Sequence, residues 1–165
     1  MAVRTVVSLP HPLLSVPAKE ILLEEAPGLL DDLVDTMRAS PACVGLAAPQ
    51  IGVARRAIAV DVSQHPKTTT SHGLVLLMNP EIIEAHDREL GREGCMSVPD
   101  LTANVARAKD IVVRGLAPDG NTRLIATEGF EARAFQHEID HLEGRLILDR
   151  VASLTTDVFR RRIYL

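Results

Sequence analysis

The sequence predicts an α+β fold in which mostly antiparallel β-sheets pack around a C-terminal helix, with a second helix near the N-terminus. Three observations support this class. The predicted elements run helix, several strands, helix, instead of alternating strand and helix. Two of the strands flank a strong turn signal typical of a hairpin. The chain of 165 residues is the size of one domain, so we expect residues 1–165 to form a single domain.

The first helix is predicted over residues 27–40. Pro27 suits a first helical turn, and Pro41 ends the helix. Apolar residues recur at helical spacing on one face: Leu29, Leu30, Leu33, Val34 and Met37. An amphipathic helix that packs one face on a sheet follows from this pattern.

The strands are expected in the middle of the chain. Residues 43–52 are apolar but carry two glycines and a proline, so they predict an irregular strand. Residues 57–62 alternate and predict a strand, and residues 63–73 predict a polar surface loop. Two further strands are predicted over 74–78 and 81–85, with a turn at Asn79-Pro80 between them.

A hairpin and a final helix complete the prediction. Residues 110–116 and 122–127 flank Pro118-Asp119-Gly120-Asn121, which is a strong turn sequence. The last helix is expected over residues 130–143, with Gly144 as the residue that ends it.

Composition and net charge argue against several classes of protein. The net charge of −4 argues against a specific nucleic-acid-binding surface. No stretch approaches the roughly 20 apolar residues of a membrane span, and we expect neither a signal peptide nor a membrane partner. The two cysteines, Cys43 and Cys95, are interpreted as thiols of a reducing cytoplasm instead of a disulfide.

The predicted final helix carries a metal-binding pattern, His137-Glu138-Ile139-Asp140-His141. Residues four apart lie on one face of a helix, so His137 and His141 can bind one ion together. Glu138 can act as a general base beside that Lewis acid. The alternative is a surface helix with two chance histidines.

A third ligand is needed, and zinc proteases often take a downstream glutamate or histidine for it. No histidine follows His141, and the carboxylates that follow are Glu143, which lies close by, Asp149 and Asp157. The best candidate lies upstream at Cys95, in the segment Arg92-Glu93-Gly94-Cys95-Met96-Ser97-Val98-Pro99. A lone cysteine is more often a small buried hydrophobic residue, but the neighbouring glycine and charges favour a ligand.

Three segments together resemble the signature motifs of the peptide deformylases. They are Gly45-Leu46-Ala47-Ala48-Pro49-Gln50, Glu93-Gly94-Cys95-Met96-Ser97, and Gln136-His137-Glu138-Ile139-Asp140-His141-Leu142-Glu143-Gly144. Their order and spacing also match, over nearly the whole chain. The resemblance implies a metal-dependent hydrolase that removes the N-formyl group from the formylmethionine of newly made polypeptides.

The resemblance also implies roles for individual residues. Cys95, His137 and His141 would bind one divalent ion, Fe²⁺ in the cell, which Zn²⁺, Ni²⁺ or Co²⁺ can replace. Glu138 would move the proton, while the Gln50 amide and the Met96 backbone N–H stabilise the oxyanion. Substrate contacts are expected from Val44, Gly45, Gly94, Phe130 and Arg133.

Some positions depart from the bacterial majority of the family. Cys43 and Ala132-Arg133 resemble the organelle-type branch, whereas Ala47 and Met96 resemble the bacterial one. We expect Cys43 to be a small buried residue. Arg133 lies on the ligand face of the helix, and its head is expected to reach solvent, a carboxylate or the substrate at the pocket rim.

Other residues receive structural interpretations. Glu93 is expected to accept a hydrogen bond from a ligand histidine, and Arg107 to pair with Asp140. His65 is expected at the surface. Arg160-Arg161-Arg162 is interpreted as a solvated terminus, with a weak ribosome contact as the alternative.

Two rival functions share parts of this pattern. A metalloprotease of the two-histidine-plus-glutamate kind would use His137, Glu138 and His141 but would not need Cys95. A non-catalytic relative that binds metal or peptide would be expected to have lost Glu138, Gln50 or a ligand, and the sequence retains them all.

Overall fold

A computed structural model describes residues 2–162 of the chain. The α-helices are α1 (Ala26–Arg38) and α2 (Gly129–Leu142). The strands are β1 (Gly45–Ala47), β2 (Ala57–Val60), β3 (Val75–Cys95), β4 (Val98–Leu116), β5 (Thr122–Glu128) and β6 (Val158–Arg160). Short 3₁₀ helices cover Pro12–Ser15, Leu23–Glu25, Ala48–Ile51 and Ile147–Asp149.

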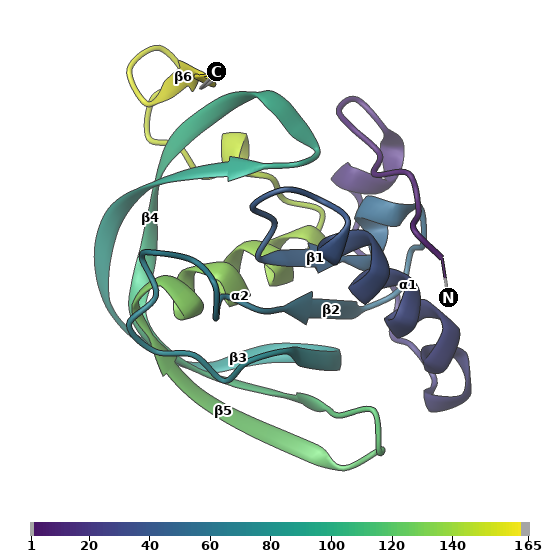
Figure 1. The fold of residues 1–165 in the computed structure, drawn as a ribbon. Coiled ribbons are helices and arrows are strands. Elements are labelled where there is room, and N and C mark those ends of the chain that lie inside the picture. Colours follow the sequence, from purple (N-terminus) through teal and green to yellow (C-terminus); the bar gives the residue numbers. More distant parts are fainter. Residues whose placement is uncertain (1, 163–165) are drawn as a thin grey trace.

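One antiparallel sheet holds these strands in the order β1-β2-β3-β4-β5, and β6 adds to β4 at Leu101–Ala103. The long strands β3 and β4 curl, so that the sheet wraps around α2 (Figure 1). The helix contacts β1, β2, β4 and β5. The predicted α+β class with a C-terminal helix at the centre of antiparallel strands is therefore confirmed.

The two helices cover opposite faces of β2, and this explains why the whole strand is buried. Ile58 and Val60 belong to the same core cluster as Phe135 of α2. Ala57 and Ala59 pack in a second cluster with the apolar face of α1. Both faces of this short strand are therefore covered, and α2 packs against β1 and β2, where its histidines meet the rest of the site.

The ends of both helices follow their local signals. Pro27 lies in the first turn of α1, and the helix ends before Pro41. Helix α2 ends at Leu142, and Gly144 adopts φ 73°, a left-handed conformation that glycine adopts without strain. The predicted hairpin is also confirmed, since β4 and β5 pair with Leu116 opposite Thr122.

The predicted turn at Asn79-Pro80 is wrong. Strand β3 continues through it with a shift of register between Met78 and Glu81, which is a bulge. Asn79 has φ 49°, and its side chain accepts from Ile21 N at 2.9 Å and donates to Ile21 O at 3.0 Å. These bonds fix a bend in the strand where the sequence suggested a reversal.

The far half of the β3–β4 ribbon has no counterpart in the sequence prediction. Residues 84–90 are exposed throughout, so this part of the strand has no buried face. The alternation of apolar and polar residues that marks a half-buried strand is therefore missing from its sequence. The pairing of β3 with β4 runs from Met78 opposite Leu116 to Cys95 opposite Val98. This ribbon delivers Cys95 to α2. No helix within residues 2–162 is both long and apolar enough to cross a membrane.

Candidate metal centre

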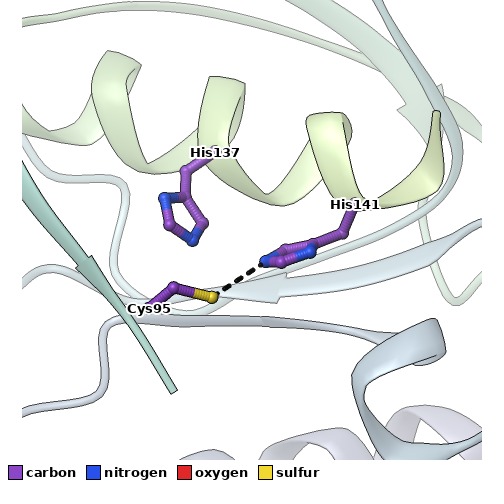
Figure 2. A group of neighbouring side chains, drawn as sticks. All are labelled: Cys95, His137 and His141. Carbon is purple, nitrogen blue, oxygen red and sulfur yellow. Dashed lines mark hydrogen bonds between the residues drawn. The ribbon is translucent and has the colours of Figure 1, made fainter. Parts of the chain in front are cut away.

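Helix α2 and the end of β3 bring three ligand-type side chains together (Figure 2). His137 and His141 lie one helical turn apart, with ring centroids 5.1 Å from each other. Cys95 Sγ lies 3.4 Å from His141 Nε2. The ligand atoms of all three residues lie within 4.8 Å of one another, a spacing that lets one ion sit about 2.0–2.3 Å from each.

The chemistry of this donor set fits a divalent transition metal. A thiolate with two imidazoles suits Fe²⁺, Zn²⁺, Ni²⁺ and Co²⁺. Burial lowers the pKa of His137, but Glu138, Cys95 and Glu93 around it raise that pKa well above the usual value. Burial holds the pKa of His141 well below its usual value, which keeps that imidazole neutral and able to donate a lone pair. The carboxylates and the thiol around His137 therefore favour positive charge at this buried position.

A carboxylate on β3 orients the first histidine. Glu93 Oε1 lies 2.9 Å from His137 Nδ1. Burial raises the pKa of Glu93, but hydrogen bonds from His137 and Arg107 hold it well below its ordinary range. An ionised carboxylate can only accept, so Nδ1 carries the proton and Nε2 is left free to bind a metal.

Two arginines hold Glu93 in place. Arg107 donates from Nη2 to Oε1 and from Nε to Oε2, both at 2.9 Å. Arg133 donates from Nη1 to Oε2 at 2.6 Å and to the carbonyl of Val105 at 2.8 Å. The guanidinium of Arg133 is thus used inside the protein, by a carboxylate 40 residues away in sequence.

Arg107 also links the sheet to α2. Arg107 Nη1 donates to Asp140 Oδ2 at 2.5 Å, and Arg150 donates to the other oxygen of Asp140 at 2.7 Å. Both expected contacts are confirmed, since Glu93 lies within hydrogen-bond distance of His137 and Arg107 pairs with Asp140. Together they link α2 to the strand that bears Cys95.

Glu138 lies between the histidines and β1. Its side chain is buried, and Oε1 has no hydrogen-bond partner among the described residues. A Cβ at Gly45 would lie 2.6 Å from Glu138 Oε2, so only glycine lets β1 approach the carboxylate this closely. Burial raises the pKa of Glu138 to about 7, which suits a group that takes up and returns a proton near neutral pH.

The amide of Gln50 is held beside the thiol. Its Oε1 accepts from Ala47 N at 3.0 Å, so the amide nitrogen must point the other way. That nitrogen lies 3.7 Å from Cys95 Sγ and donates to Ser97 Oγ at 3.2 Å. The arrangement directs an N–H donor toward the metal-binding atoms.

A cavity of about 300 Å³ opens onto this centre, at the small end of the range for ligand pockets. The candidate residues that line it are Val44, Gly45, Gln50, Gly94, Cys95, Met96, Phe130, Arg133, His137 and Glu138. Cys43 also lines it, half-buried, with Sγ 3.1 Å from Gly45 O. The structure thus brings every candidate substrate residue to one cavity.

Two residues at this cavity make contacts that the sequence did not predict. His65 was expected at the surface, but the loop of residues 63–73 stacks it on Phe130 at a centroid distance of 4.2 Å. Arg161 was expected in a solvated terminus, yet it lines the cavity and donates to Cys95 O at 3.3 Å. No local pattern marks either residue, because both contacts are made by segments remote in the chain.

Comparison with known proteins agrees with this geometry. The family model described as polypeptide deformylase matches residues 3–157. A peptide deformylase of Carboxydothermus hydrogenoformans is 47% identical over 157 residues, which is 93% of this chain and 97% of that protein. One from Halothermothrix orenii is 44% identical over 145 residues, 87% of this chain and 90% of its own.

Solved structures show the same fold. The crystal structure of peptide deformylase from Thermotoga maritima superposes with a TM-score of 0.83 at 33% identity, covering 93% of this chain and all of that one. A class I type b peptide deformylase from Acinetobacter baumannii with Met-Ala-Ser bound superposes with a TM-score of 0.81 at 34% identity, covering 91% and 99%.

Proposed function

Because this chain belongs to the polypeptide deformylase family, we propose that Cys95, His137 and His141 hold its catalytic metal ion and that Glu138 moves the proton. The chain is a metal-dependent hydrolase that removes the N-formyl group from the N-terminal formylmethionine of new polypeptides. The products are formate and a free amino terminus. The observation that carries the residue assignment is the meeting of one thiol, two imidazoles and a buried carboxyl in one cavity.

The metal is proposed to be Fe²⁺ in the cell, with Zn²⁺, Ni²⁺ or Co²⁺ able to take its place. When bound, the ion supplies Lewis-acid polarisation of the reacting oxygens. Cys95 and the Nε2 atoms of His137 and His141 would hold it. The proton on His137 Nδ1, fixed by Glu93, supports this choice of nitrogen.

The proton transfers are assigned to Glu138. Its carboxylate takes a proton from the attacking water as the water oxygen bonds to the formyl carbon. When the C–N bond breaks, Glu138 gives that proton to the leaving nitrogen, so formate and the free amine result and the carboxylate is regenerated. Burial raises the pKa of Glu138, and this supports a group that both takes up and returns a proton.

Two donors are proposed to stabilise the negative charge that develops on the formyl oxygen. They are the side-chain amide of Gln50 and the backbone N–H of Met96. The bond from Ala47 N to Gln50 Oε1 supports this role, since it orients the donor before substrate arrives.

Substrate is proposed to bind as an extended chain against the main chain of Gly45 and Gly94, with Val44, Phe130 and Arg133 shaping the methionine pocket. Backbone pairing makes the enzyme tolerant of sequence after methionine. The Acinetobacter baumannii relative has the tripeptide Met-Ala-Ser bound, which supports a peptide as the ligand of this chain. A formyl carbon bears only hydrogen, so a cramped centre admits it and excludes larger acyl groups.

The substrate also suggests where the enzyme works. Nascent formyl-Met chains emerge from ribosomes, so we place the protein in the cytoplasm. The exposed Arg160 and Arg162 are candidates for a weak contact with the ribosome.

A substrate series tests the function. Formate release from formyl-Met-Ala-Ser is compared with acetate release from acetyl-Met-Ala-Ser and with cleavage of an internal Met-Ala bond. We expect hydrolysis of the formyl peptide alone. Cleavage of the internal bond would indicate a metalloprotease instead.

A further inference from the structure

Arg161 projects from the end of β6 into the mouth of the catalytic cavity. Its Nη2 donates to the carbonyls of Cys95 at 3.3 Å and Leu101 at 3.5 Å. A Cβ at Gly94 would lie 2.4 Å from the same nitrogen, so the guanidinium packs directly on that glycine. The guanidinium of Arg161 therefore contacts the residue next to the proposed ligand Cys95, beside the proposed path of the substrate backbone.

The guanidinium of Arg161 still has unused hydrogen-bonding capacity. Its Nε is buried and has no partner within residues 2–162. Both of its hydrogen bonds within residues 2–162 go to carbonyls, which leave its charge without an acidic partner there. A partly buried guanidinium without an acidic partner is stabilised by a carboxylate that enters the cavity, because a charged donor and a charged acceptor make a strong hydrogen bond.

The rest of the mouth has the same sign of charge. Lys67 and Arg92 line the cavity with Arg161, and none of the three is paired with an acidic side chain in the described part of the chain. Arg92 lies 3.6 Å above the ring of Phe159 and donates to Asn104 Oδ1 at 3.0 Å. The chain as a whole carries −4, so this concentration of positive charge is local.

The carboxyl side chains of the cavity do not cancel this charge. Glu93 is held by Arg107, Arg133 and His137, and Glu138 lies deeper, beside Gly45. An outer groove continues from the mouth past β6, and it is lined by Arg92, Thr102, Val158, Phe159, Arg160, Arg161 and Arg162. The basic side chains therefore lie at the mouth and along the outer groove, away from the metal-binding side chains.

We propose that Arg161, assisted by Lys67 and Arg92, forms an anion-binding subsite that selects formyl-Met peptides with an acidic side chain downstream of methionine. This proposal rests on the proposed function, because it takes the formyl group to lie at the metal centre. Arg133 does not share the role, since Glu93 already neutralises it.

The test compares formyl-Met-Ala-Glu amide with formyl-Met-Ala-Gln amide. The two peptides have nearly the same shape, and amidation removes the other carboxylate. The ratio of their kcat/KM values is measured for the wild type, Arg161→Gln, Arg161→Lys and Arg145→Gln. Arg145 is an exposed arginine outside the cavity and the outer groove, so its variant controls for net charge.

We expect the wild type to favour the Glu peptide about fivefold at low salt, the size of a strong exposed ion pair. The preference should arise in KM and shrink at high ionic strength. Arg161→Gln should bring the ratio close to one, while Arg161→Lys and Arg145→Gln keep most of it. A structural defect in Arg161→Gln would slow both peptides equally and leave the ratio unchanged.

A ratio of one in the wild type, or an unchanged ratio in Arg161→Gln, would overturn the subsite. Binding of the product peptides Met-Ala-Glu amide and Met-Ala-Gln amide, measured by calorimetry, reads the subsite without hydrolysis. If neither formyl peptide released formate while the Glu product still bound more tightly, the deformylase function would fail and the subsite would stand. Equal affinities of the two product peptides would overturn the proposed subsite and leave the deformylase function standing.

Discussion

Glu93 Oε1 lies 2.9 Å from Nδ1 of His137, and this contact fixes which nitrogen of the histidine faces Cys95. The carboxylate comes from β3, two residues before Cys95, so one strand supplies both a proposed ligand and the group that orients another. A shift of this strand relative to α2 would displace both Cys95 and Glu93 from the histidines.

The first prediction concerns this contact. Glu93→Gln should weaken metal binding about 10- to 100-fold, as is typical when the partner of a ligand histidine is lost. Excess metal should restore much of the activity. Competition with a chelator of known affinity measures the effect. Glu89→Gln is the control, because Glu89 is an exposed residue of the same strand. Equal metal affinity in both variants would contradict the assignment.

The second prediction concerns the thiol ligand. Cys95→Ala should lose metal and activity together, because the two histidines leave too few ligands for tight binding. Metal content after gel filtration, measured by mass spectrometry, checks this. Cys43→Ala removes the other thiol of the cavity and should keep its metal. Full occupancy in Cys95→Ala would rule out the cysteine as a ligand.

The third prediction concerns the proton carrier. Glu138→Gln should retain metal but lower kcat at least about 100-fold, the lower end for general acid–base catalysis. Near-normal kcat would exclude the role.

The pH dependence of the same residue has a definite sign. The attacking water loses its proton to the ionised form of Glu138, so kcat/KM should fall as pH decreases through its pKa. Burial raises that pKa to about 7, and bound metal acts in the opposite direction by favouring the carboxylate. A pH profile of the wild type should therefore show an acid limb at or below neutrality. A rate that rises toward low pH would oppose the mechanism.

The fourth prediction concerns the native metal. If Fe²⁺ occupies the site, activity should decay in air, since a thiolate beside a redox-active ion invites oxidation of both. Exchange for Ni²⁺ or Zn²⁺ under nitrogen should give air-stable enzyme, with Zn²⁺ the slower. Activity that persists in air with iron still bound would contradict this expectation.

The fifth prediction distinguishes the structural role of Arg133 from the substrate-binding role proposed for Arg161. Arg133→Leu removes the bonds to Glu93 and to the Val105 carbonyl, so it should lower the free energy of unfolding by about 1–3 kcal/mol. The preference between Glu and Gln peptides should remain, because the head of Arg133 is used within the protein. Urea denaturation measures the first effect, and the kinetic ratio measures the second. A lost preference with normal stability would give Arg133 the substrate-binding role.

Much of the local structure was predictable from the sequence. Proline and glycine mark the ends of α1 and α2 within the chain itself, and the turn between β4 and β5 has its own residues. The spacing of His137 and His141 places both on one helical face without reference to any other segment. The need for a third ligand from upstream also follows from the sequence, since no histidine comes after His141.

The tertiary structure alone decided what surrounds these residues. Residues 84–90 of β3 are exposed on both faces, so no hydrophobic periodicity predicts a strand there, and only their pairing with β4 makes them one. Arg133 meets Glu93 across 40 residues, and Arg161 meets Cys95 across 66. Local sequence patterns encode helices, turns and ligand spacing, whereas contacts between remote segments depend on how the curved ribbon closes over α2.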